Sequence, residues 1–245
     1  MKTTLVLPTY NEAENLTEIV EAILANQIDD FKILIVDDLS PDGTGAIADQ
    51  MAKKYPKRIE VIHRDGPRGL GQAYIAGFKH VLQSDAQLIG QMDSDFSHPP
   101  EKLPEMIAAL KNADLALGSR YIPGGGVDRH WPIWRKGLSR WGNFYTRSIL
   151  GIPVRDTTGA FRMWRREFLE RIPFEEVISN GYIFLVELLH LADLYGARFA
   201  EVPIYFADRK WGQSKMSFRI QIEAAYRVWQ VRWRYRNLKK GLKNQ

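Results

Sequence analysis

Short apolar runs alternate with amphipathic stretches through the first half of the chain. The apolar runs predict strands at Thr3–Leu7, Lys32–Val36, Ile59–His63, Gln87–Met92 and Leu115–Gly118. Between them, apolar residues recur at helical spacing and predict helices at about Glu12–Ala25, Thr44–Lys54, Gly71–Gln83 and Leu103–Lys111. This alternation is typical of an α/β domain in which helices flank a mainly parallel sheet.

The second half of the chain is less regular. Its glycine-rich segment Tyr121–Gly126 has little local preference, and we expect it to be mobile. A basic and aromatic segment follows at Trp131–Arg147, and Asp156–Arg162 has the pattern of a turn that enters a strand. Further on, the pattern predicts a helix at Tyr182–Tyr195, a strand at Arg198–Ile204 and a long helix from about Ser217 to Leu238.

Polar residues follow the predicted strands at the points where these strands end. Tyr10 and Glu12 follow the first strand, Asp38 follows the second, Asp93–Asp95 the fourth and Ser119–Tyr121 the fifth. Ligands of such sheets bind beyond the carboxyl ends of the strands, which meet at one edge. The sequence therefore predicts a ligand site at this edge, built from acidic and aromatic side chains with an arginine close by.

The strongest local signal is the Asp93-Ser94-Asp95 sequence after the fourth predicted strand. Side chains two residues apart point to the same side of a strand, so Asp93 and Asp95 are placed to face one ligand. Two carboxylates favour a hard divalent cation that keeps diphosphate oxygens and water in its shell. The alternative is a pair of solvated loop aspartates or a helix cap, and the preceding apolar strand weakens it.

The other acidic residues at this edge have competing interpretations. Asp38 is placed to accept hydrogen bonds from a base or a ribose, while Ser40–Gly43 has ordinary turn chemistry. Tyr10 has a ring suited to stacking on a nucleobase. Glu12 is equally explained as an acid in the first turn of a helix, where the helix dipole favours it.

The glycine-rich segment Gly66–Gly71 precedes a predicted helix, as phosphate-binding loops do. It lacks the spacing of a P-loop or of a dinucleotide-binding loop. A tight connection carrying one useful arginine, Arg68, is the favoured interpretation. Among the histidines, His98 is expected to pack in the loop beside the acidic pair, and His130 is a weak candidate for substrate contact.

Composition and charge narrow the class of protein. The chain has 245 residues, 45% of them hydrophobic and 11% aromatic, which excludes bulk disorder and allows one large domain or two small ones. Cysteine is absent, so disulfides, thiolate metal sites and cysteine nucleophiles are excluded, as fits a cytosolic protein. The net charge of +5 favours an anionic partner. No window approaches the roughly 18 apolar residues of a membrane-spanning helix, and the start is too quickly polar for a signal peptide.

Taken in order, the motifs resemble those of the polyprenol-phosphate (dolichol-phosphate) mannose synthases. These are inverting glycosyltransferases of family 2 with the GT-A nucleotide-sugar-binding fold. The resemblance spans roughly residues 3–217 and rests on the following segments: Pro8–Glu12, Val36–Thr44, Gly69–Gly71, Met92–Pro99, Gly118–Tyr121, Gly124–Val127, Asp156–Arg162, Glu201–Ile204, Asp208–Arg209 and Gly212–Lys215. The arginine-tyrosine and triple-glycine element and the Gly-x-Ser-Lys element are its most specific parts.

The resemblance implies transfer of mannose from GDP-mannose to a polyprenyl monophosphate, with inversion and with Mg²⁺ or Mn²⁺ as cofactor. By match, the guanosine would be held by Pro8, Tyr10, Glu12, Val36 and Asp38. The ribose, the diphosphate and the metal would be held by Asp93, Ser94 and Asp95, with Ser97 serving the metal, directly or through a water.

On the acceptor side, the resemblance implies phosphate contacts from five residues. Arg120, Arg209 and Lys215 match residues that contact donor or acceptor phosphates, and Arg135 and Ser139 match an acceptor-phosphate site. The expected catalytic residues are thus Asp95, Arg120, Arg135 and Ser139. An anionic phosphate needs no strong general base, but it needs cations that offset its repulsion from the diphosphate. The alternative for Arg135 is a solvated basic helix face.

The predicted C-terminal helix carries two apolar faces. Ile222, Tyr226, Trp229 and Trp233 lie on one face, and Val228, Val231, Tyr235 and Leu238 lie nearly opposite. Basic residues dominate its flanks and its end. One apolar face is expected to pack on the domain and the other to meet a membrane interface or a membrane-embedded partner. A helix docked in the core or in a dimer is the alternative.

We therefore expect a catalytic domain at residues 1–216 followed by a basic, aromatic helix at 217–245, in a cytoplasmic protein peripheral to the cytoplasmic face of a membrane. One alternative function is a related family-2 transferase that uses UDP-glucose or another UDP-sugar. A passive module that binds membranes or nucleic acid is another, but it leaves Asp38, Asp93 and Asp95 unexplained, since carboxylates repel phosphate backbones.

Overall fold

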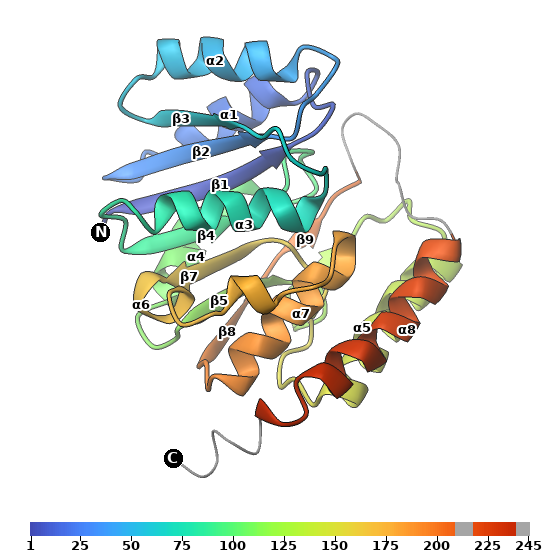
Figure 1. The fold of residues 1–245 in the computed structure, drawn as a ribbon. Helices are drawn as coiled ribbons and strands as arrows, with labels where there is room; N and C mark the ends of the chain where they lie inside the picture. The colour runs from blue at the N-terminus through green and yellow to red at the C-terminus, as the bar shows by residue number, and fades with distance from the viewer. Residues whose placement is uncertain (209–217, 239–245) are drawn as a thin grey trace.

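A seven-stranded sheet forms the centre of the protein in a computed structural model that describes residues 1–208 and 218–238 (Figure 1). The sheet order is β3-β2-β1-β4-β7-β5-β8, and a separate pair joins β6 to β9. The strand bounds are β1 Thr3–Thr9, β2 Phe31–Asp37, β3 Ile59–His63, β4 Leu88–Gln91, β5 Leu115–Ser119, β6 Gly126–Val127, β7 Arg162–Arg165, β8 Phe199–Pro203 and β9 Tyr205–Phe206.

Only β7 runs against the other strands of the large sheet. It pairs antiparallel with both β4 and β5, while the remaining neighbours are parallel. The predicted α/β fold with a mainly parallel sheet is therefore confirmed. So is the strand expected to follow the turn at residues 156–162. Because β1, β2, β4 and β5 are parallel, the polar residues that follow them meet at one edge.

Two hydrophobic cores lie on opposite faces of the sheet, as the alternation along β1 requires. Val6 belongs to a core with α3 and α7, while Leu5 and Leu7 belong to the other with α1, α2 and α4. The helix bounds are α1 Leu16–Leu24, α2 Thr44–Lys54, α3 Leu70–Val81, η1 Pro100–Lys102, α4 Leu103–Ala109, α5 Ile133–Leu150, α6 Arg166–Leu169, η2 Phe174–Glu176, α7 Gly181–Leu194 and α8 Phe218–Arg234.

Two helices differ from the sequence-based expectation. α1 begins at Leu16 rather than at Glu12, because Asn11 has a positive φ of 59° and residues 13–15 form a turn. The basic segment after Trp131 is an 18-residue helix, α5, whose two glycines obscured its periodicity. Its stability comes from packing: α5 lies alongside α8, and the two helices sit together away from α1 and α2 (Figure 1).

α8 confirms the predicted division of the C-terminal helix into two faces. Val228 and Val231 are buried in the core shared with α7, and the nearby Tyr235 is buried there too. On the other face, Tyr226 and Trp233 are 66% and 63% exposed. Within the described part of the chain, every helix is too short or too polar to cross a bilayer.

Gly77 allows α3 to sit directly on the sheet, and this contact yields a stability prediction. A Cβ added at Gly77 would overlap the Val6 side chain and lie 3.1 Å from Val36. We expect Gly77→Ala to lower the free energy of unfolding by about 1 to 3 kcal/mol through overpacking, measured by urea denaturation. The matched control is Gly137→Ala in α5, where a Cβ meets nothing within 4 Å. It should raise stability by up to about 1 kcal/mol, since alanine favours helix over glycine. Equal effects of the two variants would contradict this packing account.

Candidate functional site

A cleft of about 520 Å³ opens at the carboxyl ends of β1, β2 and β4. It is lined by residues that follow these strands, by the segment before α3 and by the first turn of α7. The sequence-predicted residues that it brings together are Pro8, Tyr10, Glu12, Asp38, Asp93, Ser94 and Asp95. Their convergence is the arrangement expected for a ligand site at this edge. Val36 is instead buried in the hydrophobic core, so its side chain belongs to the packing of α3.

The acidic pair is held in place by hydroxyl groups. Tyr74 in α3 is fully buried and donates a hydrogen bond of 3.1 Å to Asp93 Oδ1. Ser97 donates both its hydroxyl and its N–H to Asp95 Oδ1, at 2.5 and 3.1 Å. Ser94 donates to the carbonyl oxygen of Pro8 at 3.2 Å, which ties the acidic loop to β1. The predicted role of Ser97 as a metal ligand stays a prediction, and its observed contact is with Asp95.

The donor atoms at this end of the cleft suit a hard cation. Asp93 and Asp95 supply carboxylate oxygens, the ligands that Mg²⁺ and Mn²⁺ prefer. Among the described residues, no group of three or more acidic or histidine side chains forms a closed metal cage. An open set of this kind fits a cation that takes further ligands from a diphosphate and from water.

The far end of the cleft is shaped by the segment before α3. Asp38 forms an ion pair with Arg64 and accepts the N–H of Gly69 at 2.7 Å. Arg68, which precedes Gly69, donates a hydrogen bond of 2.7 Å to the hydroxyl of Tyr10, and the Arg68 guanidinium lies 5.0 Å from the centre of the Tyr10 ring. Residues 64–69 are thus a tight connection that brings an arginine to the cleft.

Glu12 precedes α1, so the interpretation as a first-turn helix acid is wrong. Its carboxylate accepts a 2.7 Å hydrogen bond from the side-chain amide of Asn15, and its N–H donates to Thr44 at 2.9 Å. Both contacts fix the chain between β1 and α1 at the rim of the cleft. His98 is buried beside the acidic loop and packs against Phe161 and Phe206, as expected of a loop-packing residue.

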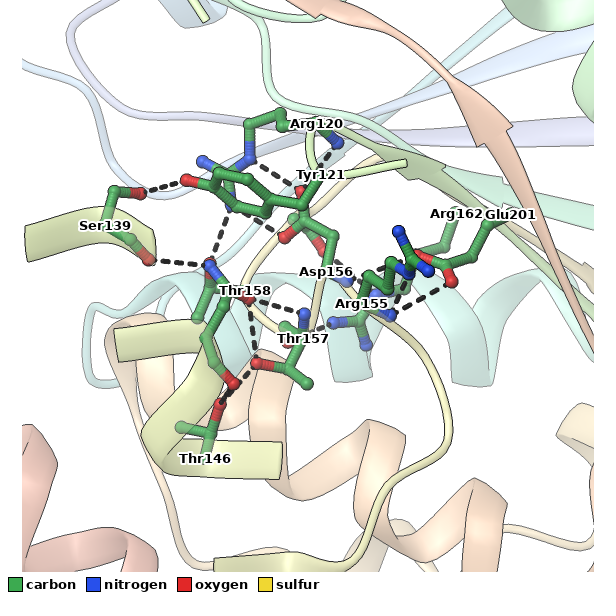
Figure 2. A network of polar contacts seen from close by, with 12 residues as sticks. Arg120, Tyr121, Ser139, Thr146, Arg155, Asp156, Thr157, Thr158, Arg162 and Glu201 are labelled. Carbon is green, nitrogen blue, oxygen red and sulfur yellow. Dashed lines mark hydrogen bonds and ion pairs between the residues drawn. The ribbon is translucent and has the colours of Figure 1, made fainter. Parts of the chain in front are cut away.

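Arg120 lies in a buried network centred on Asp156 (Figure 2). Its Nε and Nη2 donate to the two carboxylate oxygens of Asp156, both at 2.7 Å, and Nη2 also donates to Thr158 at 2.7 Å. The backbone N–H of Arg120 adds a 3.0 Å bond to the same carboxylate. Burial raises the pKa of an isolated carboxyl, but the charge and hydrogen bonds of Arg120 outweigh it and keep the pKa of Asp156 below its ordinary value.

Arg120 was expected to contact substrate phosphates, and this role stays a prediction. In the structure its guanidinium donates hydrogen bonds to Asp156 and Thr158, which gives the residue a structural role. Arg120 also lines a cavity beside α5. The sequence pattern did not show this partner, because Asp156 lies 36 residues further along the chain.

The two candidate acceptor residues of α5 lie one helical turn apart. Ser139 shares a 2.6 Å hydrogen bond with the hydroxyl of Tyr121, so α5 is tied to the segment after β5 (Figure 2). Arg135 lies 3.7 Å from the centre of the Trp131 ring, and its Nη1 is 3.4 Å from Asp208 Oδ1. Arg209 and Lys215 lie outside the described residues.

Sequence reasoning did not reveal the contacts of several residues that order the site. The hydroxyl of Tyr74 at the acidic pair is one, and the carboxylate of Asp156 is another. A third is the buried Arg162, which donates to the carbonyl oxygens of Thr157, Gly159 and Leu185. Burial lowers the pKa of Arg162 to about 10, so it stays charged at neutral pH. α8 also brings Glu223 and Arg227 to the cleft, which the sequence pattern had not indicated.

Comparison with known proteins adds a family and a fold. Residues 4–173 match the family Glycosyl transferase family 2. The polyprenol monophosphomannose synthase of Mycolicibacterium smegmatis is 45% identical over 236 residues, covering 95% of this chain and 88% of that protein. The undecaprenyl-phosphate mannosyltransferase of Micrococcus luteus is 41% identical over 233 residues, covering 95% and 94%.

Solved structures share the fold at low sequence identity. Glucosyl-3-phosphoglycerate synthase from Mycobacterium tuberculosis, in complex with Mn²⁺ and UDP, has a TM-score of 0.63 at 17% identity, covering 95% of this chain and 79% of that one. A mannosyltransferase from Pyrobaculum calidifontis, in complex with GDP-Man and Mn²⁺, has a TM-score of 0.61 at 18% identity, covering 90% and 60%.

The Arg120–Asp156 pair predicts a large cost when its acid is neutralised. We expect Asp156→Asn to lower the free energy of unfolding by about 3 to 5 kcal/mol, because it leaves a buried guanidinium without its counter-charge. Because the pKa of Asp156 is depressed in the folded state, its contribution is present above the unfolded pKa of about 3.9 and is lost as the pH falls through the lower folded value. Urea denaturation at several pH values measures both effects.

An exposed ion pair supplies the matched control. Arg198 also grips both carboxylate oxygens of Asp114, at 2.9 and 2.8 Å, but its side chain is 64% exposed. Asp114→Asn should cost about 1 kcal/mol or less. If Asp156→Asn cost no more than this control, the network of Figure 2 would not carry the stability assigned to it.

The hydrogen bond from Tyr74 to Asp93 predicts an effect on metal binding. Burial raises the pKa of Tyr74 well above its ordinary value, and the charge of Asp93 raises it further, so the hydroxyl stays a donor at neutral pH. We expect Tyr74→Phe to weaken Mn²⁺ binding in the presence of GDP by about tenfold or more, as loss of a hydrogen bond to a carboxylate does. Isothermal titration calorimetry measures this, with Tyr55→Phe as control. Unchanged affinity in Tyr74→Phe would refute the positioning role.

Proposed function

The chain belongs to glycosyl transferase family 2, and from that premise we propose that it transfers mannose from GDP-mannose to a polyprenyl monophosphate, with inversion at the anomeric carbon. The observation that carries the proposal is the cleft in which Asp38, Asp93 and Asp95 converge with Tyr10 at one edge of the sheet. The two mannosyltransferase relatives, each matched over 95% of this chain, support the choice of sugar and of lipid phosphate.

In this proposal the cleft divides the donor between two groups of residues. Tyr10, Glu12 and Asp38 hold the nucleoside, with Tyr10 stacking on the base when Arg68 gives up its place over the ring. Asp93 and Asp95 hold Mg²⁺ or Mn²⁺, while Ser97 and Tyr74 keep their carboxylates in position. When bound, the cation neutralises charge that develops on the departing diphosphate.

The acceptor phosphate brings its own nucleophile, an anionic oxygen. It therefore needs orientation and charge compensation rather than a strong base. We assign Arg135 and Ser139 of α5 to this phosphate, with Arg209 and Lys215 as further cations. Arg120 acts as a positioning residue: its ion pair with Asp156 fixes the segment after β5. Tyr121 in that segment bonds Ser139, so the end of β5 is joined to α5.

A lipid acceptor places this reaction at a membrane. We propose that the protein works as a peripheral enzyme on the cytoplasmic face of a membrane, with residues 217–245 as an attachment element. The exposed aromatic face of α8 supports this role, because tryptophan and tyrosine favour the interfacial region of a bilayer.

The test is an assay with labelled GDP-mannose, Mn²⁺ and a short-chain polyprenyl phosphate. The unaltered protein should form polyprenyl-phosphate mannose, and Asp95→Ala should lower turnover by about 100-fold or more, because the leaving diphosphate loses its electrostatic support. Asp85→Ala is the matched control, since Asp85 is an exposed acid paired with Lys2. UDP-glucose runs in parallel as a competing donor. Preferred transfer from UDP-glucose, or full activity in Asp95→Ala, would reject the proposal.

A further inference from the structure

A second cavity, of about 420 Å³, lies between α5 and the segment that follows β5. Its charged lining consists of four arginines: Arg120 after β5, Arg140 and Arg147 in α5, and Arg155 after α5. Phe144 in α5 supplies an apolar wall. None of these residues lines the donor cleft, so the two cavities are separate in the described part of the chain.

Three of the four arginines lack a counter-charge. Arg120 is neutralised by Asp156, but Arg140, Arg147 and Arg155 form no ion pair within residues 1–208 and 218–238. Glu201 lies close to Arg155, and its carboxylate accepts the backbone N–H groups of Arg155 and Asp156. Nε of Arg147 is buried and has no hydrogen-bond partner among the described residues. Buried donors are normally paired, so this unpaired nitrogen and the three arginines without a described counter-charge favour an anionic ligand for the cavity.

The sequence of α5 strengthens this positive field. The 18 residues of the helix contain four cations and no acid. Arg140 and Arg147 are seven residues apart and so share a face, whereas Arg135 and Ser139 lie on a neighbouring face of the same helix. Neither Arg135 nor Ser139 lines the arginine cavity, but Tyr121 does, and it shares a hydrogen bond with Ser139. The cavity therefore adjoins the acceptor-phosphate site assigned to Arg135 and Ser139 without including those two residues.

Exposed apolar side chains gather on the same two helices. Among the side chains that the structure describes, seven of the eleven large apolar ones that are exposed lie on α5 and α8, namely Ile133, Trp134, Trp141, Phe144, Tyr226, Trp229 and Trp233. Phe144 both lines the arginine cavity and is 66% exposed. A water-soluble anion would explain the arginines alone. An anionic headgroup on an apolar body explains both features, since aromatic and basic side chains together suit an anionic bilayer surface.

We propose that the cavity formed by Arg140, Arg147 and Arg155 binds the phosphate headgroup of an anionic phospholipid, while the exposed aromatic residues of α5 and α8 enter the bilayer interface beside it. The inference rests on the proposed function, because a lipid acceptor requires work at a membrane. It adds a lipid-binding site that adjoins the acceptor site. When the protein is bound in this way, α5 lies against the bilayer. Arg135 and Ser139 are on the face of α5 next to the one that carries Arg140 and Arg147.

The test measures co-sedimentation with vesicles of phosphatidylcholine alone or mixed with phosphatidylglycerol. The unaltered protein should bind the mixed vesicles more tightly. The combined substitutions Arg140→Gln, Arg147→Gln and Arg155→Gln should weaken that binding by roughly 10- to 100-fold, as loss of three basic groups at an anionic surface does. The matched control, Lys53→Gln with Lys57→Gln and Lys111→Gln, removes the same charge from exposed sites on other elements. Equal weakening in the control would overturn the proposal, as would equal binding of the unaltered protein to both vesicles.

A second arm separates this site from the acceptor site. Without vesicles, the triple arginine variant should keep the kcat/KM of the unaltered protein for a water-soluble, short-chain polyprenyl phosphate. Loss of that activity would make the cavity part of the acceptor site and overturn the proposal. The single variant Arg140→Gln, at an exposed helix position, should weaken vesicle binding by several-fold and guards against misfolding of the triple variant. Because sedimentation needs no sugar donor, vesicle binding without any mannosyl transfer would reject the proposed function alone.

Discussion

Two carboxylates that follow β4, those of Asp93 and Asp95, must be held close to one ligand, and the surrounding structure provides the contacts that hold them. Asp93 and Asp95 carry like charges two residues apart in one loop, so hydrogen-bond donors or a cation near them lower the cost of placing both there. The fold supplies the donors: a buried tyrosine from α3 for Asp93, and a serine two residues on for Asp95. β4 itself is buried and central in the sheet, so the pair has a rigid base. In the proposed function, a divalent cation bound by this pair supplies the remaining compensation and connects the site to the diphosphate of the donor.

At the same edge of the sheet, the positive charge of Arg120, which directly follows β5, is neutralised by a buried carboxylate. Arg120 is locked to Asp156, and that carboxylate also orders the loop leading into β7. The same network reaches α5, because Asn143 bonds Thr157 and Thr158. Within the described part of the chain, acidic side chains therefore gather at the cleft beside β1, β2 and β4, and arginines without an ion pair gather around α5. In the proposed function, this separation of charge holds two anionic substrates near each other against their mutual repulsion.

The parts of the structure that are local in sequence were predictable, and those that depend on distant partners were not. β1 to β5 each follow an apolar run, and the acids after them converge because parallel strands end at one edge. The sequence indicated α5 only as a basic and aromatic segment, with a helix face as one alternative for Arg135, because its glycines and its tertiary stabilisation hide its period. The ion pair of Arg120 could not be predicted without knowing that Asp156 lies beside it in the fold. The hydrogen bond of Asp38 with the Gly69 N–H likewise depends on how residues 64–69 fold. Charge type was readable from sequence, whereas the partner that neutralises each charge was set by packing.

The most direct test of the central claim is anomalous diffraction from crystals grown with GDP and Mn²⁺. The account predicts one manganese peak in contact with the carboxylate of Asp93 or Asp95 and with the diphosphate, in the cleft that also holds the guanine near Tyr10. A manganese peak remote from both aspartates, or GDP bound in another cavity, would contradict it.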